Sequence, residues 1–274
     1  MPELPEVETI RAGLEPKLIG RRLLRVQIDD PRLTRPYDPV EVAAELQGER
    51  IEAVGRRGKY LIIRFASERA LLIHLRMTGT VLHVADGVGA DDPYRRAVVR
   101  LDDGSDVAYR DVRRFGTWLL LEPGELDVYL DARLGPELLE RRSAPDKLLS
   151  RLAGRRAPIK AALLDQRLFA GVGNIYADEA LWWSRLHPLR QARSLTRDEV
   201  AALLRGVRRA LRSGIARQGA SLRDYRGADG ARGTMQNEFR VYGREDHPCH
   251  RCGTPIEKTR AGGRGTWYCP GCQR

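Results

Sequence analysis

The segments PCHRCG (248–253) and YCPGC (268–272) contain all four cysteines of the 274-residue chain. Their spacing, C-x2-C-x16-C-x2-C, is typical of a tetrahedral zinc site made by four thiolates. Disulfides are the poorer explanation, because a reducing cytosol keeps thiols free. A filled tetrahedron leaves no open position for chemistry, so the sequence predicts one structural Zn2+ in a small C-terminal hairpin, held by Cys249, Cys252, Cys269 and Cys272.

The chain before this module divides into a helical part and a strand-rich part. Thr196 and Glu199 form a T-x-x-E capping box before a long amphipathic helix that Gly214 or Gly219 can end. The turn GVGN (171–174) leads into another helix. Residues 219–238 are rich in glycine and charge, so we expect a mobile loop there with little to bury.

The first half of the chain alternates like a mainly antiparallel β domain with a helix at its start. Helical spacing runs from Glu3 to about Ile19, and strand-like runs follow, among them LLRVQI, YLIIRF, ALLIHLRMTGTVLHV and GTWLLL. The turn Asp102-Asp103-Gly104 indicates a hairpin. The sequence therefore predicts an α+β multidomain chain with domains at 1–133, 134–238 and 239–274.

Charge is distributed unevenly over the two halves. Residues 1–135 hold 21 basic and 23 acidic residues, whereas residues 136–274 hold 27 basic and 14 acidic ones. A basic half joined to a near-neutral half indicates a polyanionic partner, and nucleic acid is favoured over a membrane. The chain has no run of eighteen apolar residues and no basic-then-apolar start, so we expect neither a membrane span nor secretion.

The opening MPELPEVETI (1–10) allows two explanations. In the first, Pro2 and the acidic residues only favour a helix start, because proline and carboxylates suit the first turn. Alternatively, removal of Met1 would leave Pro2 with a secondary amine that is partly unprotonated at neutral pH and could act as a nucleophile. At 100° per residue, Glu3 and Glu6 lie on or beside the apolar stripe of this helix, where a charge needs a partner or a task.

Possible anion contacts come from the second half. The glycines of GVGN permit close backbone approach, and Asn174 adds a side-chain donor at a helix start. Lys160 lies shortly upstream and is one of only five lysines, against 43 arginines. Arg264, in the basic tip between the two cysteine pairs, is a natural phosphate contact.

Six segments, in order and spacing, resemble the bacterial formamidopyrimidine-DNA glycosylases. They are MPELPEVET (1–9), RRGKYL (56–61), HLRMTG (74–79), RDVRRFG (110–116), LLDQRLFAGVGNIYADEAL (163–181), and VYGRE (241–245) with the cysteine tail. The resemblance implies an N-terminal two-layer β-sandwich flanked by helices, a helix–two-turn–helix domain and a zinc finger β-hairpin. Endonuclease VIII, the sister group, shares the proline, Glu3 and the zinc tail, but the LPEVET start and the long 219–238 loop favour the formamidopyrimidine branch.

The resemblance also implies roles for single residues. Pro2 would attack the sugar of a flipped-out nucleotide, Glu3 would act as an acid, and Glu6 would order the terminus or a catalytic water. Lys59 would contact the lesion nucleotide or its phosphate, the alternative being one more strand-edge cation. Three residues would fill the hole left by the flipped base, although the two apolar ones could instead be core residues: Met77, Arg113 and Phe115. Backbone phosphates would be bound by Lys160, Asn174 and Arg264, and Arg264 would also assist δ-elimination.

The function expected from the resemblance is that of a base excision repair enzyme. It would be a bifunctional DNA glycosylase and apurinic/apyrimidinic lyase that removes 8-oxoguanine and formamidopyrimidines and cuts the strand by β,δ-elimination. One alternative is an endonuclease VIII-like preference for oxidised pyrimidines, and another is a zinc-containing protein that binds damaged DNA without cutting it. We expect a monomer that acts on double-stranded DNA with oxidised bases or abasic sites, in the bacterial cytoplasm at the nucleoid.

Overall fold

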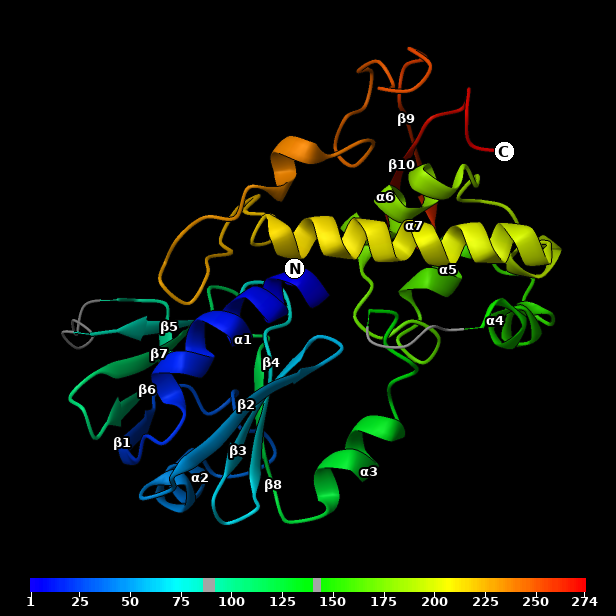
Figure 1. Ribbon diagram of the computed structural model, residues 1–274. Helices are drawn as coiled ribbons and strands as arrows, with labels where there is room; N and C mark the ends of the chain where they lie inside the picture. Colours follow the sequence, from blue (N-terminus) through cyan, green and yellow to red (C-terminus); the bar gives the residue numbers. More distant parts are fainter. Residues whose placement is uncertain (86–91, 140–143) are drawn as a thin grey trace. The chain divides into compact units, whose positions relative to one another are not determined.

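The computed structural model describes residues 1–85, 92–139 and 144–274 (Figure 1). The chain forms two compact units. Unit 1 contains Met1–Ala132 and Arg217–Thr234, and unit 2 contains Arg133–Ala216 and Met235–Arg274. The segment 217–234 thus packs with the N-terminal half, although it lies within the predicted central domain. The division at 133/134 and 238/239 into three domains stays a prediction.

Unit 1 is built on two four-stranded antiparallel sheets. The first has the order β1-β6-β7-β5 and the second the order β2-β3-β4-β8. The strands are β1 (Leu23–Ile28), β2 (Ile51–Arg57), β3 (Tyr60–Phe65), β4 (Ala70–His74), β5 (Thr80–Val84), β6 (Arg95–Leu101), β7 (Asp106–Arg110) and β8 (Thr117–Leu121). The helices of this unit are α1 (Leu4–Leu18), α2 (Pro39–Leu46) and α3 (Glu125–Asp131). The predicted antiparallel β domain that begins with a helix is confirmed, including the hairpin of β6 and β7.

One apolar core joins the two sheets. Side chains from both of them, such as Val99 on β6 and Ile63 on β3, belong to the same buried cluster as Ile10 and Leu14 of α1. Because α1 contacts β2 and β3 of one sheet and β5 of the other, it closes the edge of the sandwich. The run 70–84 is not one strand as its composition suggested. It is divided into β4 and β5, which belong to different sheets, so residues 75–79 cross from one layer to the other.

The prediction that residues 219–238 have little to bury is wrong for residues 219–234, which belong to unit 1. Tyr225 and Ala228 are 7% and 3% exposed and belong to the core cluster of unit 1. Backbone atoms of this segment also pair with β5, since His83 N donates to Ala228 O over 2.8 Å. Composition missed this burial because only two side chains of the segment, those of Tyr225 and Ala228, enter the core cluster.

Unit 2 is helical and ends in a two-stranded hairpin. Its elements are α4 (Pro145–Leu152), α5 (Ile159–Leu164), α6 (Asn174–Ser184), α7 (Arg197–Ala216), the 3-10 turns η1 (Ala192–Ser194) and η2 (Met235–Glu238), and the strands β9 (Glu257–Ala261) and β10 (Arg264–Tyr268). The predicted capping box precedes α7: Thr196 N donates to Glu199 Oε2 over 2.8 Å, and Glu199 N donates to Thr196 Oγ1 over 3.3 Å. None of the helices among the described residues is long and apolar enough to cross a membrane.

Candidate functional site

Three turns meet at one end of the sheet β2-β3-β4-β8. Tyr60, the first residue of β3, pairs with His74, the last of β4, and His74 pairs with Thr117, the first of β8. The Gly58–Lys59 turn, the loop 75–79 and the loop 111–116 therefore leave the sheet at the same end. The two loops also rejoin the other sheet side by side, because Thr80 pairs with Arg110.

The start of α1 lies at this same end. Arg56, next to the Gly58–Lys59 turn, donates to Glu8 of α1 over 2.8 Å and to Gly58 O over 3.0 Å. At the far end of the helix, Gly20 N donates to Ile51 O, at the opposite end of β2. The helix thus runs away from the Lys59 turn, and its first residues stay beside that turn. The structure brings the predicted catalytic residues of unit 1 to one end of the sandwich.

Pro2 and the two neighbouring carboxylates are buried. Pro2 is buried behind an exposed Met1, and Glu3 and Glu6 are each only 2% exposed. The Glu6 carboxylate accepts hydrogen bonds from Glu3 N over 2.8 Å and from Ala220 N over 2.8 Å. This confirms that both carboxylates face inward. It also shows that Glu6 holds the start of the chain, at Glu3, against the backbone of Ala220.

A glycine of the segment 217–234 permits this contact with Glu6. Gly219 has φ +80°, and a Cβ there would lie 2.9 Å from Glu6 Cγ. Tyr225 then donates to Glu6 O over 3.2 Å and to Gln218 O over 3.1 Å. The N-terminus is therefore held by a segment more than two hundred residues away in the sequence, a partnership that periodicity within α1 could not reveal.

Lys59 is a buried turn residue. It is 6% exposed, so its charge is not solvated like that of a surface lysine. Burial lowers the pKa of the nearby His74 to about 3, and the charges of Arg76 and Lys59 add to this effect. The neutral His74 ring accepts a hydrogen bond at Nδ1 from Arg76 N over 3.0 Å and meets Tyr60 edge-on. Sequence reasoning missed His74, although it opens the HLRMTG segment.

The three residues predicted to fill the hole left by a flipped base, here called the wedge residues, lie on the loops 75–79 and 111–116. Phe115 is 52% exposed, so it is not a core residue, and Arg113 is also exposed. The Arg113 guanidinium carbon lies 4.8 Å from the centre of the Phe115 ring, as expected for a cation–π pair. Met77 is half-buried on the loop 75–79. Two exposed, stacked side chains on one rigid end of a sheet have a shape suited to insertion between flat bases.

Arg264 is exposed at the tip of the hairpin in unit 2. Gly262 and Gly263 form the two-residue turn with φ +56° and +75°, and Arg264 is the first residue after it. Behind it, Gly265 O accepts from Asn174 Nδ2 over 3.1 Å and from Lys160 Nζ over 2.8 Å. The predicted GVGN turn does precede α6, and Asn174 is its first residue.

Lys160 occupies a different environment from the predicted one. Its side chain is fully buried, and its Nζ lies 2.7 Å from Asp178 Oδ1. Asp178 also accepts from Trp267 N of β10 over 3.1 Å. Burial raises the pKa of the Asp178 carboxyl, and the ammonium of Lys160 opposes this rise. The pair fastens the hairpin to α5 and α6, whereas a direct phosphate contact would need the Lys160 side chain to leave it.

The four cysteines converge as a metal site requires. Their sulfur atoms all lie within 4.8 Å of one another, with Cys252 and Cys269 separated by 3.4 Å and Cys249 and Cys272 by 3.8 Å. Tetrahedral zinc with bonds of about 2.3 Å places its sulfurs about 3.8 Å apart, so the arrangement fits Zn2+. Two residues that sequence reasoning missed support these sulfurs. Trp182 Nε1 donates to Cys249 Sγ over 3.3 Å, and Arg251 Nη1 donates to Cys272 Sγ over 3.4 Å.

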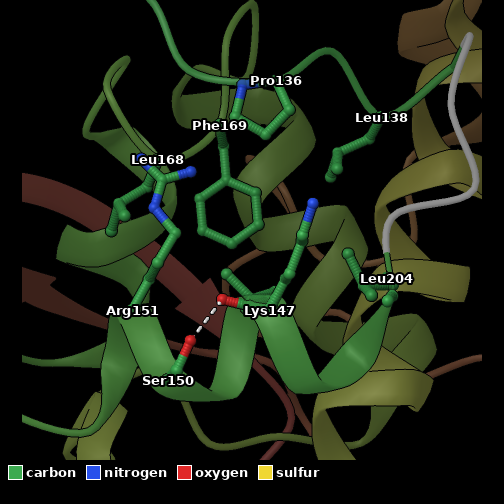
Figure 2. A pocket seen from close by; sticks show the side chains of 10 residues that line it. Pro136, Leu138, Lys147, Ser150, Arg151, Leu168, Phe169 and Leu204 are labelled. Atoms are coloured by element: carbon green, nitrogen blue, oxygen red, sulfur yellow. Dashed lines mark hydrogen bonds between the residues drawn. The ribbon is translucent and has the colours of Figure 1, made fainter.

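Unit 2 also contains a pocket of about 480 Å³ that is separate from these residues. Figure 2 shows the Phe169 ring at its centre and Lys147 and Arg151, both from α4, at its border. The other lining residues are Pro136, Leu138, Ala144, Leu148, Ser150, Leu168 and Leu204. The pocket's lining combines apolar walls with two cations and includes none of the predicted site residues, so we assign the chemistry to the end of the sandwich instead.

Known proteins share this architecture along the whole chain. The family models that match are the formamidopyrimidine-DNA glycosylase N-terminal domain (residues 1–118), the H2TH domain of the same enzymes (134–226) and a zinc finger found in FPG and IleRS (246–274). The formamidopyrimidine-DNA glycosylase of Chloroflexus aggregans is 48% identical over 274 residues, covering 100% of this chain and 98% of that protein. That of Roseiflexus sp. is 45% identical and covers 100% of both.

Solved structures agree with this match. A Lactococcus lactis FPG mutant in complex with Fapy-dG-containing DNA superposes with a TM-score of 0.91 at 35% identity, covering 100% of both chains. L. lactis Fpg in complex with DNA that contains an abasic site superposes with a TM-score of 0.90 at 34% identity, covering 99% of both. The resemblance inferred from six sequence segments is confirmed, and so are the β-sandwich, helical and zinc finger parts of the expected fold. The chain belongs to the formamidopyrimidine-DNA glycosylase family.

Proposed function

We propose that this enzyme removes oxidised purines from duplex DNA and cuts the strand through an imine formed by Pro2. Loss of Met1 frees the Pro2 amine. Its nitrogen attacks C1′ of the damaged nucleotide, the bond from C1′ to the base breaks with its electron pair leaving on the base, and the proton of the amine passes to the departing base. Glu3 protonates the sugar ring oxygen, so the ring opens and the nitrogen and C1′ form an iminium.

The iminium withdraws electrons and acidifies the hydrogens on C2′. Removal of one of these protons expels the 3′ phosphate by β-elimination, and a second elimination expels the 5′ phosphate. Glu3 is the residue best placed to carry protons between these steps, since it adjoins the nucleophile. Arg264, exposed at the hairpin tip, supplies a cation for the phosphates and assists the second elimination.

The observation that carries this proposal is the gathering of buried ionisable groups around a chain terminus. Glu3, Glu6 and Lys59 are 2%, 2% and 6% exposed, and all three are at the end of the sandwich where α1 begins. Burying several charges is costly unless they serve a purpose, and such clusters are typical of catalytic sites. Stabilisation of the helix dipole alone would not require burial, because exposed carboxylates stabilise it equally well.

Duplex DNA with oxidised bases or abasic sites is the proposed partner, bound by a monomer at the bacterial nucleoid. The damaged nucleotide leaves the stack, and Met77, Arg113 and Phe115 fill its place. Arg264 and Asn174 hold the backbone by phosphate contacts. Lys160 contributes to the same binding indirectly, because it fixes Gly265, next to Arg264, through a hydrogen bond of 2.8 Å.

The zinc ion has a structural part in this function. It would be held by Cys249, Cys252, Cys269 and Cys272. Its four bonds to sulfur would cross-link the chain segments on either side of the hairpin. Fixing the hairpin keeps the Arg264 tip against α5, where a Cβ on Gly262 would lie 3.1 Å from Ala161 Cβ. The metal thereby serves DNA binding and supplies no catalytic ligand.

Oxidised pyrimidines are a second candidate substrate. One solved structure, 34% identical with a TM-score of 0.90, is wild-type L. lactis Fpg in complex with DNA that contains an oxidised pyrimidine. The wedge and the nucleophile would serve either base, since neither reads the base edge. A panel of duplexes with 8-oxoguanine, a formamidopyrimidine or an oxidised pyrimidine, compared by single-turnover rates, ranks the substrates.

The Pro2→Gly variant tests the catalytic proposal. A glycine at the terminus gives a primary amine with no ring to orient it, so we expect strand cleavage to be abolished while affinity for a lesion duplex stays within about twofold. The control is Pro39→Gly at the start of α2, which should cleave normally. Full cleavage by Pro2→Gly would contradict the assignment of the nucleophile.

A further inference from the structure

We propose that Asp111 and Thr78 form a clamp that joins the loops 75–79 and 111–116 into one rigid wedge. Thr78 would then act by positioning this wedge and not by reading the damaged base. The inference rests on the proposed wedge function of Met77, Arg113 and Phe115. It concerns two residues to which neither composition nor spacing assigned a role.

The Asp111 carboxylate is the centre of the clamp. It is 1% exposed and begins the loop 111–116 directly after β7. Its Oδ2 accepts from Phe115 N over 2.9 Å and from Gly116 N over 2.8 Å. Its Oδ1 accepts from Arg113 N over 3.2 Å. One buried carboxylate thus fixes the backbone of both wedge residues of its own loop.

Thr78 connects the second loop to this centre. Its hydroxyl donates to Asp111 Oδ1 and accepts from Arg113 N over 3.0 Å. A threonine hydroxyl can donate one hydrogen bond, and that of Thr78 is donated to Asp111. Thr78 therefore has no proton left for a base acceptor, whereas Met77, its chain neighbour, is tied to the position of Arg113 through this bond.

The space behind the clamp admits no larger residues. The Tyr109 hydroxyl lies against both loops, so that a Cβ on Gly79 would come within 2.5 Å of it and one on Gly116 within 1.6 Å. These two glycines let the loops approach closely enough for Thr78 to reach Asp111. A second anchor holds the outer side: Arg114, with φ +58°, makes two hydrogen bonds of 2.6 and 2.9 Å to Asp30.

Rigidity matters to a wedge because base stacking resists it. Opening a base step has a cost in free energy, and side chains on a loop that gives way would insert only in part. An abasic site has no base to expel, so its processing depends less on the wedge. A clamp variant should therefore slow the removal of an intact oxidised base more than it slows cleavage at a preformed abasic site.

The test compares these two rates in four variants of the full-length zinc-loaded protein. Thr78→Val removes the hydroxyl at constant volume, Thr78→Ser restores it, and Asp111→Asn weakens the centre. Phe115→Ala reports on the wedge itself. The matched control is Asp106→Asn. It removes a second buried carboxylate, which lies on β7 outside the two loops and pairs with Arg100.

We expect Thr78→Val and Asp111→Asn to slow 8-oxoguanine excision about ten- to a hundredfold, the effect of losing one buried hydrogen bond, with abasic cleavage within about threefold. Thr78→Ser and Asp106→Asn should match the wild type. Stopped-flow fluorescence of 2-aminopurine beside the lesion should show the same loss in base opening. If Phe115→Ala slows 8-oxoguanine excision while Thr78→Val excises at the wild-type rate, the clamp proposal is wrong. If Phe115→Ala is normal, the wedge function itself fails and the clamp with it.

Discussion

Lys160→Met decides whether this buried lysine is a structural residue or a phosphate contact. The side chain is fully buried, with its ammonium 2.7 Å from Asp178 Oδ1 and 2.8 Å from Gly265 O. Removing one partner of a buried ion pair costs about 3–5 kcal/mol, because the other charge is left without compensation. Burial already raises the pKa of Asp178, so this carboxyl can take up a proton when Lys160 is gone, and we expect the lower value, about 3 kcal/mol.

The assay is urea unfolding followed by tryptophan fluorescence. Three of the four tryptophans, Trp182, Trp183 and Trp267, lie in unit 2, so the signal reports the part that contains Lys160. Lys147→Met, at an exposed position on α4, is the control and should change stability by less than about 0.5 kcal/mol. The double variant Lys160→Met/Asp178→Asn removes both charges and should recover about half of the loss.

DNA affinity separates the two roles of Lys160 further. Each phosphate contact contributes about 0.9 to the slope of log affinity against log salt concentration. We expect Lys160→Met to leave this slope unchanged and Arg264→Met to reduce its magnitude by about 0.9, because only Arg264 is exposed. A Lys160→Met protein of normal stability with a reduced slope would refute the structural role and restore the direct contact.

The remaining predictions concern pH and metal. The folded pKa of His74, about 3, lies below the ordinary value of 6.5, so its contribution to stability is complete above pH 6.5 and is lost as the pH falls towards 3. Between pH 7 and pH 5, His74→Phe should therefore lose about 1–2 kcal/mol less unfolding free energy than the wild type, and equal losses in urea titrations would contradict this. Zinc removal by a chelator, or Cys269→Ser, should weaken binding of a lesion duplex at least about tenfold in fluorescence anisotropy, since the hairpin then lacks the metal site that fixes it. Affinity that survives complete loss of the metal would show that the hairpin does not hold the DNA.

Local sequence features predicted the elements that depend on local rules. The cysteine spacing, the capping box at Thr196 and the hairpin at Gly104 each follow from short-range geometry, and the structure contains all three. Helical periodicity was also sufficient to turn Glu3 and Glu6 inward, because the helix itself sets their direction.

Contacts between distant segments could not be predicted in the same way. The Ala220 N–H that binds Glu6, and the Asp178 carboxylate that binds Lys160, come from segments whose own composition suggests a loop and an ordinary helix. Likewise, Lys160 has the sequence context of a surface cation, and only the packing of β10 on α5 and α6 buries it. The Asp111–Thr78 bond depends on two crossings between sheets, which no single segment specifies.

The central claim, that Pro2 is the nucleophile, is tested most directly by borohydride trapping on a duplex with 8-oxoguanine opposite cytosine. Reduction converts the iminium into a stable amine, and mass spectrometry of the digested adduct locates the linked residue. We predict a single cross-link at the nitrogen of Pro2 in a chain that lacks Met1. A cross-link at Lys59 or another lysine, or the absence of an adduct from a protein that still removes the base, would contradict the account.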